Sequence, residues 1–218
     1  MRTELVGASA VIVANHFNPS VVSHLWLVRN GVLAEDELQQ GSIFADPLVQ
    51  VLAPRFALVL TPDQLQFLPA STDPDRGGLI AEKVGRIVEL LPETPYKAIG
   101  LNFTYHIRPE AGDVRVMARR LFFRESIPIY REFDCEDANF GAYLSKDALG
   151  FRLKLDLRPM NGVEKSGQTV HFFQALFNFH AELEPAPGAV DRLKALLHRW
   201  SAASELAARS ALLITEGV

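Results

Sequence analysis

The chain contains little cysteine, and this scarcity limits the chemistry open to it. Of its 218 residues only Cys135 is a cysteine, which excludes an intramolecular disulfide and any metal site built from several thiolates. Cys135 lies in an acidic stretch with Asp134, Glu136 and Asp137, and nearby carboxylates raise the pKa of a thiol. We therefore interpret Cys135 as an unreactive loop residue.

Long apolar runs, surplus positive charge and familiar catalytic motifs are also absent. No stretch approaches the roughly 18–20 apolar residues of a membrane span, and Met1 to Glu4 does not resemble the start of a signal peptide. We expect a soluble, cytoplasmic protein without a membrane partner. A net charge of −4 opposes nucleic-acid binding, which requires surplus Lys and Arg. The chain has no phosphate-binding loop, GxGxxG, GxSxG or HExxH pattern, so we predict no cofactor and no metal.

An internal repeat is the strongest organising feature that the sequence does contain. Residues 42–67 align without gaps with residues 126–151, and Phe67 falls opposite Phe151. Two flanking matches keep the same order, residues 14–19 with 104–109 and residues 84–91 with 190–197. We therefore predict a tandem duplication, with a first repeat at 1–93 and a second repeat at 94–218.

Periodicity gives each repeat the same succession of elements. Residues 97–107 alternate between large apolar and small or polar side chains, which predicts a half-buried strand, and residues 8–17 are its counterpart. Helices are predicted after each first strand, over 18–31 and from Asp113 to Phe122, and at each repeat's end, over 80–91 and 190–213. Between them we expect antiparallel strands with hairpin turns at Thr61–Gln64 and Ser145–Ala148, then strands over 149–158 and 168–183 joined by a loop that contains Asn161 and Gly162. The first repeat has no counterpart to the long last strand.

The fold class predicted from this succession is α+β. It consists of a duplicated β-α-β-β-β(-β)-α unit that forms an antiparallel sheet with helices on one face. This order of elements resembles the TATA-binding-protein-like fold, although no motif specific to that family is present. The resemblance implies a sheet with one curved, open face, and it suggests nucleic-acid binding, which the charge opposes.

Two histidines, His16 and His106, are the most suggestive candidate site residues. Each ends the first strand of its repeat, three residues before a proline. If the two first strands lie side by side, the imidazoles could face one cleft, where two histidines with a nearby carboxylate could bind a metal or transfer protons. The alternative is that each histidine stabilises the turn that follows it, which a duplication would produce twice.

Strand parity predicts which other residues line the open face. Gly100 and Ala98, with Ala8, Ala10 and Ala14, are expected to form a shallow floor. Polar residues on the same parity are expected to form its walls, and they are Asn102, Thr104, Arg152, Lys154, Asn178 and His180. We expect a ligand to lie over Gly100 within reach of His16 and His106. An ordinary solvated sheet face is the alternative.

The sequence does not determine the function, and two classes remain open. The first is a non-enzymatic binding or assembly protein that uses the open face or an exposed strand edge. Self-association is expected because a repeat with fewer strands leaves an edge to be covered. The second is an enzyme that acts on a small polar molecule in a cleft between the repeats, using His16, His106 and Asn102.

Overall fold

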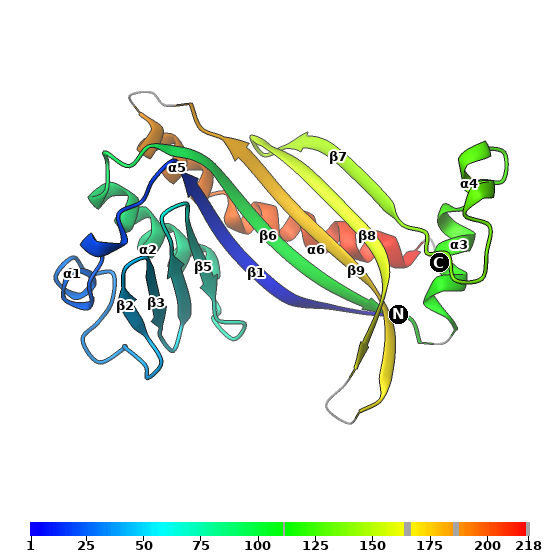
Figure 1. Cartoon of the computed structure of the whole chain (residues 1–218), viewed down its shortest axis with the longest axis horizontal. Helices are drawn as coiled ribbons and strands as arrows, with labels where there is room; N and C mark the ends of the chain where they lie inside the picture. The colour runs from blue at the N-terminus through cyan, green and yellow to red at the C-terminus, as the bar shows by residue number, and fades with distance from the viewer. Residues whose placement is uncertain (111, 164–166, 185–187, 217–218) are drawn as a thin grey trace.

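A computed structural model describes residues 1–110, 112–163, 167–184 and 188–216. Within these residues the strands form one antiparallel sheet of nine strands, which confirms the α+β class (Figure 1). Their order across the sheet is β2-β3-β4-β5-β1-β6-β9-β8-β7. In chain order the strands are β1 (Arg2–Ala14), β2 (Ile43–Ala45), β3 (Leu48–Leu52), β4 (Phe56–Leu60), β5 (Gln64–Pro69), β6 (Tyr96–Arg108), β7 (Ala142–Ala148), β8 (Phe151–Val163) and β9 (Thr169–Glu182).

The helices cover one face of this sheet and one of its ends. In chain order they are the 3-10 helix η1 (Pro19–Val21) and the α-helices α1 (His24–Arg29), α2 (Arg76–Leu90), α3 (Val114–Phe122), α4 (Pro128–Glu132), α5 (Ala189–Leu197) and α6 (Trp200–Glu216). Figure 1 shows α2, α5 and α6 behind the sheet, while α3 and α4 lie beyond one end of it. The front of the sheet in this view carries no helix among the described residues, and we call it the open face.

The core lies between the sheet and α2, α5 and α6, as the alternation of β6 requires. Leu101 and Phe103 are buried on the helix side, and the Phe103 ring packs 4.7 Å from that of Trp200 at the start of α6. The alternate residues of β6 face the open side, where Asn102 is only half-buried. The strand predicted over 97–107 is therefore confirmed. The predicted cap of α3 is confirmed as well, because a carboxylate oxygen of Asp113 accepts a hydrogen bond from the Arg115 backbone N–H.

The two halves of the chain meet at β1 and β6, which pair in the middle of the sheet. Moving outward from this pair, the first half contributes β5, β4, β3 and β2, and the second half contributes β9, β8 and β7. The first half therefore has one strand more than the second, the short β2. Our prediction that the first repeat lacks a strand was therefore wrong. The error arose because β2 and β3 lie in a stretch of sequence where turn residues break the periodicity.

The predicted hairpin turns have different outcomes. Thr61–Gln64 joins β4 to β5, and its closing hydrogen bond from Thr61 N to Gln64 O measures 2.9 Å. Ser145–Ala148, in contrast, belongs to β7, and the turn lies at Leu149 and Gly150, which have φ values of 57° and 77°. Sequence reasoning missed this turn because its first residue is a leucine, which rarely adopts positive φ.

The shifted turn changes the comparison of the two halves. Phe67 lies in β5, beside the central pair, whereas Phe151 lies in β8, one strand farther out. Both side chains are buried, but the strands that hold them do not occupy equivalent places in the sheet. The ungapped alignment of 42–67 with 126–151 is therefore wrong at the level of strands.

Three further predicted boundaries need correction. Asn161 and Gly162 are not in a loop, because they pair with His171 and Val170 in the hairpin of β8 and β9. The helix expected over 18–31 is divided into η1 and α1, and the helix expected over 190–213 is divided into α5 and α6. Within the described ranges, no helix has both the length and the apolar character of a membrane span.

Candidate functional site

Six of the predicted site residues lie together on the open face, in two adjacent rows that cross the strands. In one row Gly100 of β6 lies opposite His180 of β9, which lies opposite Arg152 of β8. In the next row Asn102 of β6 lies opposite Asn178 of β9, which lies opposite Lys154 of β8. We call the whole set the Gly100 site, and it consists of Gly100, Asn102, Asn178, His180, Arg152 and Lys154.

A ladder of side-chain hydrogen bonds orders one of these rows. The side-chain N–H of Asn178 donates to Asn102 Oδ1 over 2.7 Å, and the side-chain N–H of Asn102 donates to Ser9 Oγ over 3.4 Å. Ser9 is on β1, opposite Asn102, and is buried. Each bond restrains the rotation of an amide, so the ladder presents both Asn side chains in defined orientations across β9, β6 and β1.

Gly100 leaves a gap beside this ladder. A Cβ atom added at Gly100 would lie 3.4 Å from Asn178 Nδ2 and 3.8 Å from Asn102 Nδ2, and no other described atom outside the neighbouring residues would be within 4 Å. Both amide nitrogens therefore border the space over Gly100, where the sheet presents backbone rather than a side chain. Of the five residues expected to form the shallow floor, Gly100 and Ala98 are on the open face.

Two cations lie on the same face of the sheet, on β8, two strands from Gly100. The Arg152 guanidinium donates from Nη2 to Ser145 Oγ over 2.7 Å and from Nη1 to Asp147 Oδ1 over 3.2 Å, so two residues of β7 hold it in place. Lys154 lies opposite Asn178 and is half-buried, and it forms no ion pair with any residue in the described part of the chain. The Gly100 site thus combines amide donors, an imidazole and two cations.

A surface hollow of about 1090 Å³ begins at the Gly100 site and continues around the end of the sheet. It takes in the three residues Arg152, Lys154 and His180. Its lining also includes the carboxylates of Asp147, Glu182 and Glu184. Farther along it includes two cations that the sequence did not suggest, Lys97 at the start of β6 and Arg192 on α5. Only the fold brings these residues near the site, so no local sequence signal could have identified them.

The remaining three predicted residues lie elsewhere. Thr104 is on the open face of β6, one row beyond Asn102. His106 lies one row farther still, with its ring centroid 4.0 Å from that of Phe172. Partial burial lowers the pKa of His106, and the nearby Arg108 adds to this effect, while Glu4 opposes it. His16 follows the end of β1 and is exposed in a loop.

The structure separates the two histidines that we expected to share a cleft. Because β1 and β6 are antiparallel, Val13 near the end of β1 pairs with Ala98, whereas His106 pairs with Glu4 near the start of β1. Ala98 and His106 are eight residues apart, which is about 26 Å along a strand. His16 and His106 therefore lie at opposite ends of the central strand pair, and the cleft expected to hold both does not form.

Three alanines expected on the floor were also assigned to the wrong face. Ala10 and Ala14 of β1 are buried on the helix side with Ile12, and Ala8 shares their parity. We had transferred the parity of His16 to the strand, but the chain leaves the sheet after Ala14. Ser9 occupies the open face instead. The run Val11-Ile12-Val13 is apolar on both faces, so its periodicity gave no signal.

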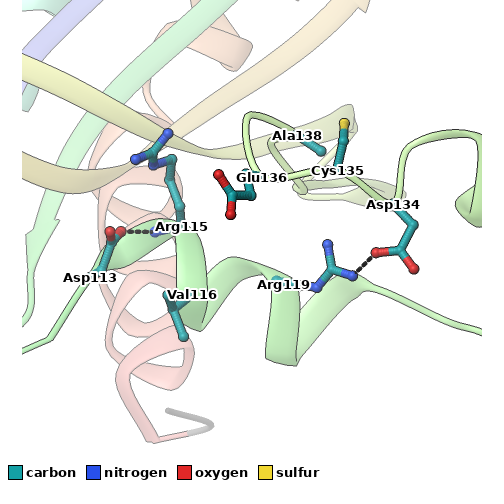
Figure 2. Close-up of a pocket in the computed structure, with 8 residues that line it drawn as sticks. All are labelled: Asp113, Arg115, Val116, Arg119, Asp134, Cys135, Glu136 and Ala138. Atoms are coloured by element: carbon teal, nitrogen blue, oxygen red, sulfur yellow. Dashed lines mark hydrogen bonds and ion pairs between the residues drawn. The ribbon is translucent and has the colours of Figure 1, made fainter.

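A second hollow, of about 390 Å³, lies between α3 and the loop after α4 (Figure 2). Arg119 of α3 is ion-paired with Asp134, and its guanidinium lies over the Phe123 ring at 4.4 Å from the centroid. A hydrogen bond with Asp137 and partial desolvation raise the pKa of the exposed Cys135 thiol. The direction expected for this thiol is confirmed, and the hollow offers no activated nucleophile.

Comparison with known proteins adds no assignment. No protein-family model matches the chain, and no curated protein matches it in sequence. Across the residues that the structure describes, no group of three or more His, Cys, Asp or Glu side chains is placed to hold a metal ion. A proposal about function therefore depends on the geometry of the open face.

Proposed function

We propose that this chain is a non-enzymatic binding protein that holds a small anionic molecule, a carboxylate or a phosphate, over Gly100. One observation carries the proposal: three adjacent strands place groups that can donate hydrogen bonds on the face that carries Gly100, a position that has no side chain of its own. The amides of Asn102 and Asn178, the guanidinium of Arg152 and the ammonium of Lys154 all suit the oxygens of an anion.

The expected affinity follows from the two cations. A hydrogen bond to a charged group contributes about 1.5–3 kcal/mol. Two such bonds, from Arg152 and Lys154, correspond to a dissociation constant between about 40 µM and 6 mM for a small anion. A natural ligand that also extends into the neighbouring hollow would bind more tightly, because it would bury more of its surface.

The site favours binding over catalysis. Acid–base chemistry at a cleft between the two halves was expected to use His16 and His106 together, and the antiparallel register places them far apart. The Gly100 site contains one imidazole, that of His180, and the amides beside it can bind and orient a ligand but do not exchange protons readily.

We also infer that residues 1–93 and 94–218 are copies of one unit of the TATA-binding-protein-like type. The order of strands supports this inference, because in each half the first strand is central and the last strand lies next to it. In such an arrangement the Gly100 site belongs to the second copy. In the first copy β5 takes the place of β9, and Gln66 lies near the place of His180.

Isothermal titration calorimetry with inorganic phosphate and with succinate tests the proposed function. The wild-type protein should bind at least one of these anions with a dissociation constant below about 6 mM. Arg152→Ala and Lys154→Ala should each weaken binding by about 10-fold to 100-fold, the equivalent of one charge-assisted hydrogen bond.

Arg158→Ala is the matched control for these titrations. Arg158 is on the same strand and the same face as Arg152, and the two side chains are similarly exposed. Arg158 lies three rows away from Gly100, where it forms an ion pair with Asp156. Its replacement should change the affinity less than twofold. The proposal fails if neither anion binds with a dissociation constant below about 6 mM, or if Arg158→Ala weakens binding as much as Arg152→Ala.

A further inference from the structure

The two edges of the sheet differ in a way that points to a partner. At one edge β2 has only three residues, and the Phe44 ring packs 5.9 Å from that of His24, next to η1. At the other edge β7 has seven residues, of which the five from Tyr143 to Asp147 are exposed. Figure 1 shows no described segment along the outer side of β7. Long exposed edge strands are templates for pairing with another strand.

The register of the β7–β8 hairpin shows which backbone groups of β7 are unpaired by β8. The two-residue turn at Leu149 and Gly150, both with positive φ, makes Ala148 and Phe151 a hydrogen-bonded pair. Pairs of this kind recur at every second residue of an antiparallel ladder. The N–H and C=O groups of Tyr143, Ser145 and Asp147 therefore point away from β8.

An apolar hollow accompanies this edge on the helix side. It has a volume of about 370 Å³ and lies between β7 and α6. Leu144 forms one wall and is 58% exposed, and Leu213 of α6 forms another and is 63% exposed. The floor consists of Leu153, Leu155 and Phe177 from the adjacent strands. Apolar groups and unpaired backbone groups therefore occur along the same edge, as at an interface.

We propose that β7 pairs antiparallel with β7 of a second copy of this chain, about a twofold axis that passes through Ser145. This register places Ser145 opposite Ser145 of the second copy, and Tyr143 opposite Asp147 of the second copy. All seven residues of β7 are then paired. The three residues whose backbone N–H and C=O groups point away from β8 lie opposite residues of the same kind, so about six new backbone hydrogen bonds form. The helices of both copies lie on the same side of the joined sheet.

Charge favours a second copy in this register over two neighbouring registers. A twofold axis at Lys146 would oppose two lysines, and an axis at Asp147 would oppose two aspartates. With the axis at Ser145, Lys146 lies opposite Leu144 of the second copy on the helix side. The apolar side chains of the two hollows then meet across the axis, and the pairing leaves the Gly100 site on the opposite face.

Sedimentation velocity on the full chain tests this proposal. The wild-type protein should sediment as a dimer, with twice the chain mass of 24.2 kDa. Ser145→Pro should raise the dimer dissociation constant at least tenfold, because it removes the central outward N–H. The monomer tolerates this change, because an edge-strand N–H that points to solvent has no partner to lose. Circular dichroism verifies that the variant is folded.

Ser145→Ala is the matched control, because it removes the hydroxyl that binds Arg152 but keeps the backbone N–H. It should remain dimeric. A wild-type protein that is monomeric at 100 µM overturns the proposal, and so does a Ser145→Pro variant that dimerises as well as Ser145→Ala.

Disulfide formation tests the pairing register of the two β7 strands directly. In a Cys135→Ser background, Ser145→Cys should cross-link to the second copy under mild oxidation, since paired Cα atoms are about 5.5 Å apart. Asp147→Cys should not, because the two Cα atoms at this position are about 13 Å apart in the proposed register. Equal cross-linking at both positions, or cross-linking only at position 147, contradicts the register.

Discussion

The substitution Gly100→Leu distinguishes the open face from the core most sharply. Its Cβ would lie 3.4 Å from Asn178 Nδ2, at the limit of ordinary contact, and the end of that side chain can move aside for the rest of the leucine. Loss of the Asn178–Asn102 hydrogen bond would cost about 0.5–1.5 kcal/mol. Replacing a strand glycine recovers about 0.5–1 kcal/mol, because glycine loses more backbone entropy on folding. We therefore expect a net loss of stability below about 1 kcal/mol, together with loss of anion binding.

Ala10→Leu is the opposite case on the neighbouring strand. Ala10 pairs with Leu101 of β6, but its side chain is on the helix side and is 0% exposed. Three additional carbon atoms at this position must be forced into a packed core, which costs about 1–3 kcal/mol or more. Both substitutions place a leucine in the centre of the sheet, one on the open face and the other on the helix side.

Urea unfolding followed by circular dichroism measures both changes in the free energy of unfolding. The expected order is a small loss for Gly100→Leu and a larger loss for Ala10→Leu. If Gly100→Leu loses more than about 2 kcal/mol while Ala10→Leu loses less than about 1 kcal/mol, the assignment of the two faces is wrong.

Three further outcomes are expected. Phe151→Ala should lose about 3–5 kcal/mol of stability in urea unfolding because the ring is 3% exposed, whereas Phe133→Ala, at 57% exposed, should change it by less than about 0.5 kcal/mol. The hydrogen bond from Arg55 lowers the pKa of Asp73, so the loss of stability caused by Asp73→Asn should be full at pH 7 and should shrink as the pH falls below the ordinary value of 3.8. An equal loss of stability at pH 3 would contradict this. His106 should titrate below 6.5 in NMR because burial lowers its pKa, and a value above 6.5 would contradict this by showing that attraction to Glu4 outweighs burial.

The part of the fold that the sequence predicted is the part with strong local patterns. Ile99 to Ile107 alternate so clearly that β6 and its two faces could be assigned directly. Asp113 identified the start of α3 through its capping chemistry. The six residues of the Gly100 site came from parity on β6, β8 and β9, where large apolar and polar side chains alternate.

The errors arose where local pattern carried no information. Val11, Ile12 and Val13 are apolar on both sides, so the faces of β1 could not be read from periodicity. The turn at Leu149 lacks favourable turn residues except Gly150, and Asn161-Gly162 resembles a turn but pairs within a strand. The separation of His16 from His106 depends on the antiparallel pairing of β1 with β6, a contact between distant residues that no local pattern encodes.

The central claim is that an anion binds over Gly100, and NMR titration of the labelled protein with inorganic phosphate tests it most directly. We expect the side-chain amide signals of Asn102 and Asn178, together with the backbone amide of Gly100, to shift in a saturable manner. The signals of Arg115 and Arg119, at the hollow beside α3, should remain unchanged. Shifts confined to α3, or no saturable shift at the two asparagines, would contradict the account.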